Sequence, residues 1–342
     1  MKNYISLFLS AVLALVLLTG AAIPASAENA SEPAEKLSIV TTIFPEYDWV
    51  MNILGDQAAN ADVTMLLDNG VDLHSYQPTV DDIVKISGCD LFVYVGGESD
   101  DWVEDALQEA VNDEMITLNL LEILGEKVKE EEVMEGMEAE HDHEEEHDHD
   151  EDHEEAHHHE EGEAEYDEHV WLSLRHASAI CERIAEVLAA LDPDHAEGYQ
   201  ANAAAYITKL SALDAEYQAA VNSAQVKTLL FGDRFPFRYL TDDYGLDYYA
   251  AFVGCSAETE ASFETIVFLS GKLDELGLHA ICQIESADGK IAETIRNNTK
   301  AQDQEILTLD SMQSTTSRDA AEGTSYLSVM EGNLEVLKAA LQ

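Results

Sequence analysis

The sequence predicts an α/β protein made of two doubly wound, Rossmann-like lobes that are joined by one long helix. Two series of short β-branched runs alternate with amphipathic stretches, one series on each side of a long segment without proline. Alternation of this kind is typical of parallel sheets that are covered by helices on both faces. Because the two series follow the same pattern, each is expected to form one lobe.

The first series predicts four strands with helices between them. The strands are expected at Leu37–Thr42, Val63–Leu67, Leu91–Val95 and Met115–Leu118. The helices are expected at Pro45–Leu54, Thr79–Ser87 and Asp101–Val111, with another from about Arg175 to Leu191. We place this amino-terminal lobe at residues 36–190.

A long helix is predicted between the two series. Asp192-Pro193 is a typical helix start, with an N-cap residue and proline in the first turn. From Ala196 to Ala224 the chain has no proline and one glycine, Gly198. About 30 residues at 1.5 Å each give a helix of about 45 Å. Residues 193–224 are therefore expected to form a rigid strut between the lobes.

The second series fills residues 225–342 and has the same order of elements. Its strands are expected at Thr228–Phe231, Asp247–Val253, Ala280–Ile284 and Glu305–Leu309. Its helices are expected at Phe235–Tyr244, Ser262–Leu276, Gly289–Asn297 and Tyr326–Leu341. Two lobes of this kind place their strand ends at a common crevice, where a ligand is expected to bind.

The first 27 residues have the features of a secretory signal peptide. Lys2 precedes an apolar stretch at residues 5–18, and Ala25-Ser26-Ala27 is a small-residue cleavage pattern. The apolar stretch is too short to span a bilayer comfortably, and no cysteine lies near the cleavage point to carry a lipid anchor. We expect a mature protein that works outside the cytoplasm, in the periplasm or at the cell surface.

The charge is concentrated in one unusual run. The net charge of −53 excludes nucleic acid as a partner, since a phosphate backbone would be repelled. Residues 126–168 consist almost only of Glu, Asp and His and hold eight of the thirteen histidines. Imidazole and carboxylate at this density suit divalent cations, zinc above all. With almost nothing apolar to bury, residues 126–166 are expected to be a disordered loop.

A protease motif occurs within the run. His153-Glu-Glu-Ala-His157 matches the HExxH pattern of zinc metalloproteases. His and Glu are so frequent here that a chance match is expected, and no apolar stripe would dock such a helix in a core. The protease interpretation is therefore rejected.

Outside the run, two histidines and two aspartates are candidate ligands. His74 follows the second predicted strand, and His169 opens the ordered segment after the run. Asp233 and Asp310 directly follow apolar strands of the second lobe. Taken singly, a loop histidine is more often idle in solvent and such an aspartate is more often a helix N-cap. At the crevice between two lobes, they become candidates for a ligand site.

The four cysteines allow two interpretations. Cys89, Cys181, Cys255 and Cys282 have no CxxC spacing, which argues against a cysteine metal site. Outside the cytoplasm, Cys255 and Cys282 would form a plausible disulfide between adjacent strands. The alternative is four buried thiols.

The motifs together resemble those of the zinc- and manganese-binding proteins of bacterial ABC importers. The resemblance covers nearly the whole mature chain, and a histidine- and acid-rich loop between two histidine motifs is characteristic of the zinc members. It rests on Ile39–Pro45 as the opening strand, residues 70–78 as the first histidine loop, Cys89–Val95, Glu168–Ser173 as the second histidine motif, and Tyr326–Leu341 as the last helix.

The resemblance implies a metal ion buried between the lobes. His74 matches the first histidine ligand, His169 the second, and Asp310 the acidic ligand after the last strand. Zinc members usually have a third histidine where this chain has Gly232-Asp233.

Asp233 is taken as the replacement for that third histidine, since carboxylate oxygen also binds zinc. Glu258, Glu260 or a water molecule could fill the place instead. Two histidines and two carboxylates also suit manganese, so Mn²⁺ is the alternative ion to Zn²⁺.

The function implied is capture of Zn²⁺ outside the cytoplasm and its delivery to an ABC permease with its ATPase. The protein is expected to be a monomer that meets the membrane only through the permease. Four protein ligands would leave no open position for hydrolysis, which disfavours an enzyme. The alternatives are a manganese or iron importer component, and an extracellular zinc buffer or metal-dependent adhesin. Zinc affinity is expected to fall as pH drops through the histidine range.

Overall fold

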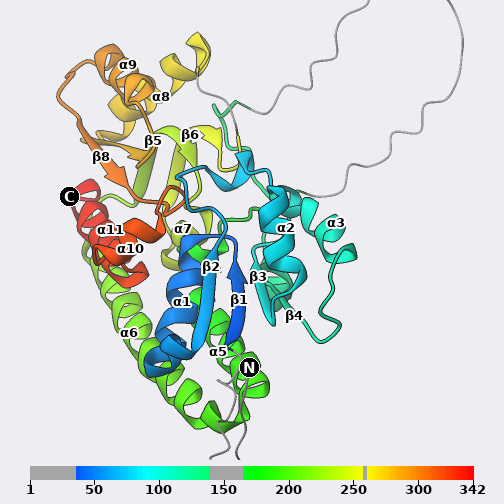
Figure 1. Ribbon diagram of the computed structural model, residues 1–342. Helices are drawn as coiled ribbons and strands as arrows, with labels where there is room; N and C mark the ends of the chain where they lie inside the picture. The colour runs from blue at the N-terminus through cyan, green and yellow to red at the C-terminus, as the bar shows by residue number, and fades with distance from the viewer. Residues whose placement is uncertain (1–35, 139–164, 257–259) are drawn as a thin grey trace, which may run out of the picture. The chain divides into compact units, whose positions relative to one another are not determined.

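The computed structural model describes residues 36–138, 165–256 and 260–342 (Figure 1). The predicted signal peptide at 1–27, the dense part of the histidine-rich run and the candidate ligand Glu258 lie outside these residues. In the described part of the chain, no helix is long and apolar enough to cross a membrane.

The first sheet has four parallel strands in the order β2-β1-β3-β4. They are β1 at Leu37–Thr41, β2 at Ala61–Met65, β3 at Leu91–Tyr94 and β4 at Ile116–Asn119. The helices of this lobe are α1 at Phe44–Leu54, α2 at Val80–Ser87, α3 at Trp102–Gln108 and α4 at Leu120–Leu124. The central strands are apolar on both faces and buried, as expected of a parallel sheet between helices.

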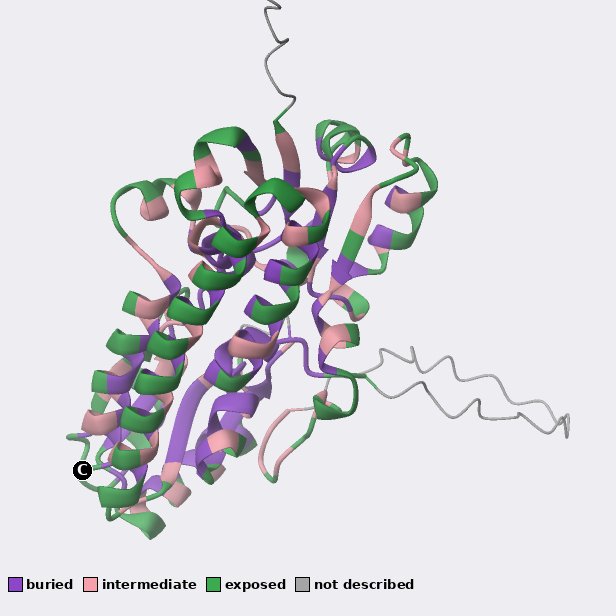
Figure 2. Ribbon diagram, turned by 90° about the horizontal axis from the view of Figure 1, so that it is seen from below, coloured by how far each residue is buried: buried purple, intermediate pink, exposed green. Residues whose placement is uncertain are grey.

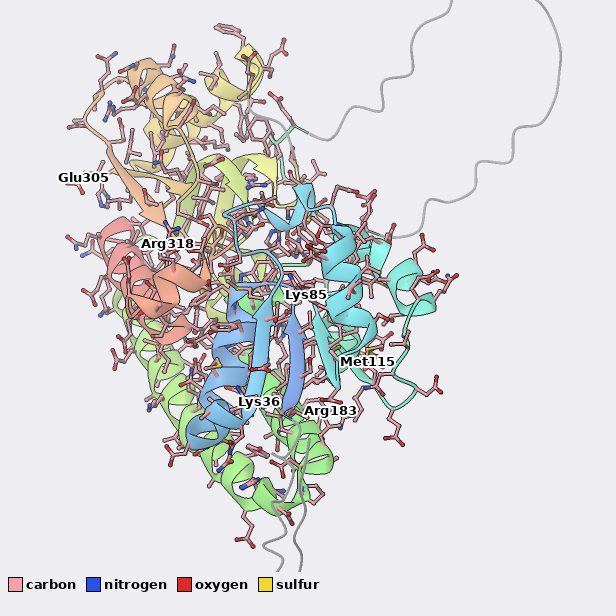
Figure 3. All side chains as sticks on the ribbon, viewed as in Figure 1. Lys36, Lys85, Met115, Arg183, Glu305 and Arg318 are labelled. Carbon is pink, nitrogen blue, oxygen red and sulfur yellow. The ribbon has the colours of Figure 1, made fainter. Side chains whose placement is uncertain are left out.

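The second sheet is also parallel, in the order β6-β5-β7-β8. Its strands are β5 at Thr228–Phe235, β6 at Asp247–Val253, β7 at Ala280–Ile284 and β8 at Glu305–Leu309. Its helices are α7 at Arg238–Tyr244, α8 at Phe263–Leu276, α9 at Lys290–Asn298, α10 at Ser317–Ala321 and α11 at Tyr326–Ala340. In Figure 3, Lys36 and Glu305 mark the amino ends of β1 and β8. His74 and Asp310 follow the carboxyl ends of β2 and β8.

Two packed helices connect the sheets. α5 at Leu174–Leu191 leads through a short 3-10 turn at Pro193–His195 into α6 at Ala196–Ser223, which has 28 residues. α6 packs along α5 and also contacts α1 and α11. Buried and exposed positions alternate along the helices, as amphipathic helices require (Figure 2). Two parallel-sheet lobes and a long connecting helix confirm the predicted fold class.

β5 differs from the prediction in a way that affects the site. The strand continues past its predicted end at Phe231 to Phe235, and its pairing with β6 shifts register between Phe231 and Arg234. Such a shift marks a β-bulge. Asp233 therefore lies inside this irregular strand segment, whereas the sequence analysis placed it just after the strand.

Residues 126–138, the first part of the segment predicted to be a disordered loop, are described by the structure. This segment contacts the second sheet, where the backbone N–H of Glu138 donates to the carbonyl of Ala251 in β6 at 3.0 Å. Apolar side chains in this segment are partly buried against the core: Val128, Met134 and Met137. These three side chains supply apolar burial that the acidic composition of the segment did not predict. The remaining domain limits stay a prediction.

A buried carboxylate connects three helices. Asp48 on α1 accepts hydrogen bonds from the hydroxyl of Tyr206 on α6, at 3.1 Å, and from the backbone N–H of Tyr326 on α11, at 3.2 Å. The rings of Trp49 and Tyr326 lie edge to face with centroids 5.2 Å apart. These contacts hold the last helix of the chain against the first lobe. Burial raises the pKa of Asp48 to about 6, although both hydrogen bonds lower it.

Replacing Asp48 with Asn is expected to stabilise the protein at neutral and higher pH. Because the folded-state pKa is raised, the stability linked to the proton is complete below the ordinary value of 3.8 and lost as pH rises through about 6. Asn is uncharged, and its amide oxygen can accept the same hydrogen bonds. The free energy of urea unfolding near pH 8 should therefore rise by about 1–3 kcal/mol.

The difference between the Asp48→Asn variant and the parent protein should shrink toward pH 4. Asp303→Asn, at an exposed position, serves as the matched control and should change stability by less than about 0.5 kcal/mol. A variant that is less stable than the parent at pH 8 would contradict the assigned cost of the buried charge.

Candidate metal centre

Three potential ligand atoms from distant parts of the chain meet at one point. His74 lies in the 3-10 turn Leu73–Ser75, and His169 precedes the 3-10 turn Val170–Leu172. Their Nε2 atoms are 3.1 Å apart. The Sγ atom of Cys255 completes a group in which every ligand atom lies within 4.8 Å of the others. Across residues 36–138, 165–256 and 260–342, no second group of this kind occurs.

The ring of His74 is held by its neighbours. Its backbone N–H donates to the carboxylate of Asp72 at 3.1 Å, which caps the turn. Its Nδ1 lies 2.7 Å from the hydroxyl of Ser99 and 3.5 Å from a carboxylate oxygen of Glu168. Because these groups engage Nδ1, the other ring nitrogen is directed to the group of ligand atoms, as in the outer shell of metal-binding histidines.

His169 is held in the same way and is fully buried, with 0% of its surface exposed. One oxygen of Asp167 lies 2.9 Å from the backbone nitrogen of His169 and 3.0 Å from its Nδ1. A carboxylate against Nδ1 favours the tautomer whose Nε2 lone pair is free for a metal ion.

The electrostatics favour neutral ligands in the absence of a cation. Burial, followed by the neighbouring His169, lowers the pKa of His74 to about 3, so this imidazole is neutral at ordinary pH. Burial also raises the pKa of the Cys255 thiol, and the negative charge of Glu131 raises it further. A metal ion would therefore have to displace the thiol proton, which a cation does by direct coordination.

An acidic cavity adjoins the ligand group. It has a volume of about 250 Å³ and contains His74 and Cys255 in its wall. The rest of the wall is Glu98, Ser99, Glu131, Glu165, Tyr166 and Glu168. Four carboxyl groups in so small a space attract cations and repel anions. Glu165 and Tyr166 are the first described residues after the gap at residues 139–164, so the carboxyl-terminal end of the histidine-rich run lines this cavity.

Asp233 is not part of the group. Its two oxygens accept hydrogen bonds from the backbone N–H groups of Arg234, at 2.9 Å, and Ile284, at 3.1 Å. It lines another cavity, of about 360 Å³, together with Asp72. Arg234, the next residue, forms an ion pair with Asp72 and so links the bulge of β5 to the loop of His74.

Asp310 directly follows β8, as predicted, but it too stands outside the group. One of its oxygens accepts a hydrogen bond from the backbone N–H of Met312 at 2.7 Å. Burial, followed by the nearby Glu285, raises its pKa to about 6. Of the other proposed third ligands, Glu260 is exposed. The structure thus brings His74 and His169 together and does not bring either aspartate to them.

Cys255 is the ligand candidate that the sequence analysis missed. All four cysteines are free thiols, so the suggested Cys255–Cys282 disulfide is wrong. Cys282 is buried within β7, opposite Phe231 of β5, whereas Cys255 lies beyond the end of β6. A CxxC pattern could not reveal this group, because it contains one cysteine and its three potential ligand atoms come from separate segments of the chain. The available signal was a polar residue just after a strand, the same signal that identified His74.

A sequence model of the family described as zinc-uptake complex component A, periplasmic (ZnuA), matches residues 39–340. The chain is 31% identical over 308 residues to the zinc-binding protein AdcA of Streptococcus pyogenes, covering 89% of this chain and 56% of that protein. It is 31% identical over 313 residues to the high-affinity zinc uptake system protein ZnuA of Bacillus subtilis, covering 92% and 90%. The chain thus spans a little over half the length of AdcA.

Solved structures show the same fold. The Zn(II)-bound ZnuA-like domain of Streptococcus pneumoniae AdcA superposes with a TM-score of 0.66 at 29% identity, covering 90% of this chain and 99% of the domain. The metal-dependent lipoprotein YcdH of Bacillus subtilis gives 0.69 at 27% identity, with 90% and 99% covered.

The native protein is expected to react with iodoacetamide first at Cys255. This thiol is partly exposed, whereas Cys89, Cys181 and Cys282 are buried. Because burial raises its pKa, Cys255 should still react more slowly than a thiol of the unfolded chain at the same pH. Peptide mass spectrometry of timed samples measures the four rates.

A thiol titration in denaturant without reductant is the matching control. All four thiols should react there, and a count of two would contradict the free state of Cys255 and Cys282. Labelling of a buried cysteine ahead of Cys255 would contradict the described burial.

Proposed function

The chain belongs to the family of periplasmic zinc-uptake component A proteins, and on that premise we propose that it captures Zn²⁺ outside the cytoplasm and delivers it to an ABC permease. The observation that carries this proposal is the His74–His169 pair, with Nε2 atoms 3.1 Å apart. Two imidazoles at this distance, each with its Nδ1 engaged elsewhere, suit a shared zinc ion.

The site is better suited to holding an ion than to catalysis. His169 is fully buried, and the adjoining cavity of about 250 Å³ is lined largely by carboxyl groups. Such a lining attracts a cation. We therefore propose zinc as cargo, with an ATP-driven permease as the partner, and no enzymatic reaction at this site. The names of the relatives, a zinc-binding protein and a zinc uptake protein, support this choice.

Ligation by Asp233 and Asp310 stays a prediction. Both carboxylates accept backbone hydrogen bonds, but each keeps lone pairs with which it could also bind an ion. The proposal for zinc rests on the two histidines and does not need either aspartate.

His74→Ala or His169→Ala is expected to weaken tight zinc binding more than about 100-fold, because loss of an outer-shell partner alone costs 10–100-fold. Competition against a chromophoric chelator measures the affinity. His279→Ala removes an exposed histidine and is the matched control, with no expected change. Tight binding that survives in both site variants would exclude this site.

Asp233→Asn and Asp310→Asn, measured in the same assay, test the predicted four-ligand set separately. A loss comparable with that of His74→Ala would place the aspartate in the site. An affinity within a factor of about three of that of the parent protein, equivalent to less than about 1 kcal/mol, would exclude the aspartate as a ligand.

The histidine-rich run is proposed to gather zinc in many weak sites. Deletion of residues 140–160 should leave one tight site and abolish the weaker ones, because a low-complexity segment cannot hold one ligand geometry. Calorimetric titration counts both classes, and replacing the same segment by a Gly-Ser linker of equal length controls for loop length. Loss of the tight site on deletion would overturn this division of roles.

A further inference from the structure

Cys255 is the one member of the ligand group that comes from the second lobe. His74 lies in the loop after β2 of the first sheet and His169 precedes α5, whereas Cys255 follows β6 of the second sheet. An ion bound by all three would therefore be enclosed from both lobes. This observation concerns the metal ligands of the proposed function and rests on that proposal.

The backbone around Cys255 is positioned to present its thiol. The preceding residue, Gly254, packs so closely that an added Cβ would lie 2.9 Å from the carbonyl oxygen of Phe235 and 3.0 Å from Cε1 of His169. Only glycine allows the chain to approach the His169 ring to this extent. The backbone N–H of Cys255 donates to a carboxylate oxygen of Glu131 at 3.1 Å, and this hydrogen bond fixes the backbone of Cys255 as well.

The chemistry of the group differs from that of a carboxylate site. Two imidazole nitrogens and one thiolate form a borderline-to-soft donor set, which suits Zn²⁺ and softer ions and is poorly matched to Mn²⁺. Binding forms an S–metal bond as the S–H proton leaves to solvent, so the thiolate supplies one negative charge to the ion. Asp233 and Asp310, the hard oxygen ligands that the sequence predicts, lie outside this group of three.

We propose that Cys255 is the third protein ligand of the metal centre, and that its thiolate makes the site selective for Zn²⁺ and Cd²⁺ over Mn²⁺. The second lobe thus contributes sulfur where the sequence analysis expected carboxylate oxygen. Replacing Cys255 should weaken Zn²⁺ binding more than about 100-fold, beyond the loss typical of an outer-shell partner, and should weaken Cd²⁺ binding more than Mn²⁺ binding.

Zinc-edge X-ray absorption of the full chain tests the proposal without a variant. The protein is loaded with less than one equivalent of zinc, so that the tight site fills before the histidine-rich run. A zinc–sulfur scattering path at about 2.3 Å is expected beside the shorter zinc–nitrogen paths. Scattering from nitrogen and oxygen alone, with tight binding intact, would overturn the cysteine ligand and leave the proposed function standing.

Cobalt substitution gives an independent spectroscopic measure. The Co²⁺-loaded protein should show a thiolate-to-cobalt charge-transfer band in the near ultraviolet, which disappears in Cys255→Ser and persists in the control Cys282→Ala. Persistence of the band in Cys255→Ser would overturn the assignment. Absence of any tight Zn²⁺ site in the parent protein would instead overturn the proposed function, and the cysteine ligand with it.

Discussion

The site depends on one constraint, the clamping of the segment that carries His169 between the two lobes. The indole N–H of Trp171 donates to the carbonyl of Ser311, just after β8, at 2.8 Å. The hydroxyl of Tyr326, at the start of α11, donates to the carbonyl of Trp171 at 2.6 Å. Trp171 and Tyr326 are fully buried, so loss of either hydrogen bond would leave a buried polar group with no hydrogen-bond partner, from the protein or from water. The backbone beside His169 is therefore held by groups of the second lobe.

The loop of His74 is held by the second lobe as well. Asp72 caps the turn of His74 with one oxygen and pairs through the other with Arg234, in the bulge of β5. Each histidine thus occupies its place because groups from both lobes are packed together, and the 28-residue helix α6 connects the same two lobes. A site assembled in this way would bind an ion with little reorganisation, since the two imidazoles are already oriented by their neighbours.

Most of the fold could be predicted, because the signals for it are local. Alternating apolar runs and helix starts depend on neighbouring residues, and three of the four second-lobe strands were predicted with their observed limits. β5 was the exception. Its extension through Gly232 and Asp233 depends on the pairing of Arg234 with Phe252 in β6, which no local pattern reveals. The defined structure of residues 126–138 was not predicted, for a related reason. It depends on burial of a few apolar side chains against distant elements.

The sequence by itself determined the class of fold, the order of its elements, the family and the two histidine loops, because periodicity and short motifs are properties of contiguous residues. Only the tertiary structure decided which side chains share a point in space. It placed the thiol of Cys255 within 4.8 Å of both imidazole nitrogens and engaged Asp233 and Asp310 with backbone donors. The physical reason is that a metal site needs side chains from distant parts of the chain to lie close together. Strand register, bulges and the packing of the two lobes set the distances between those side chains.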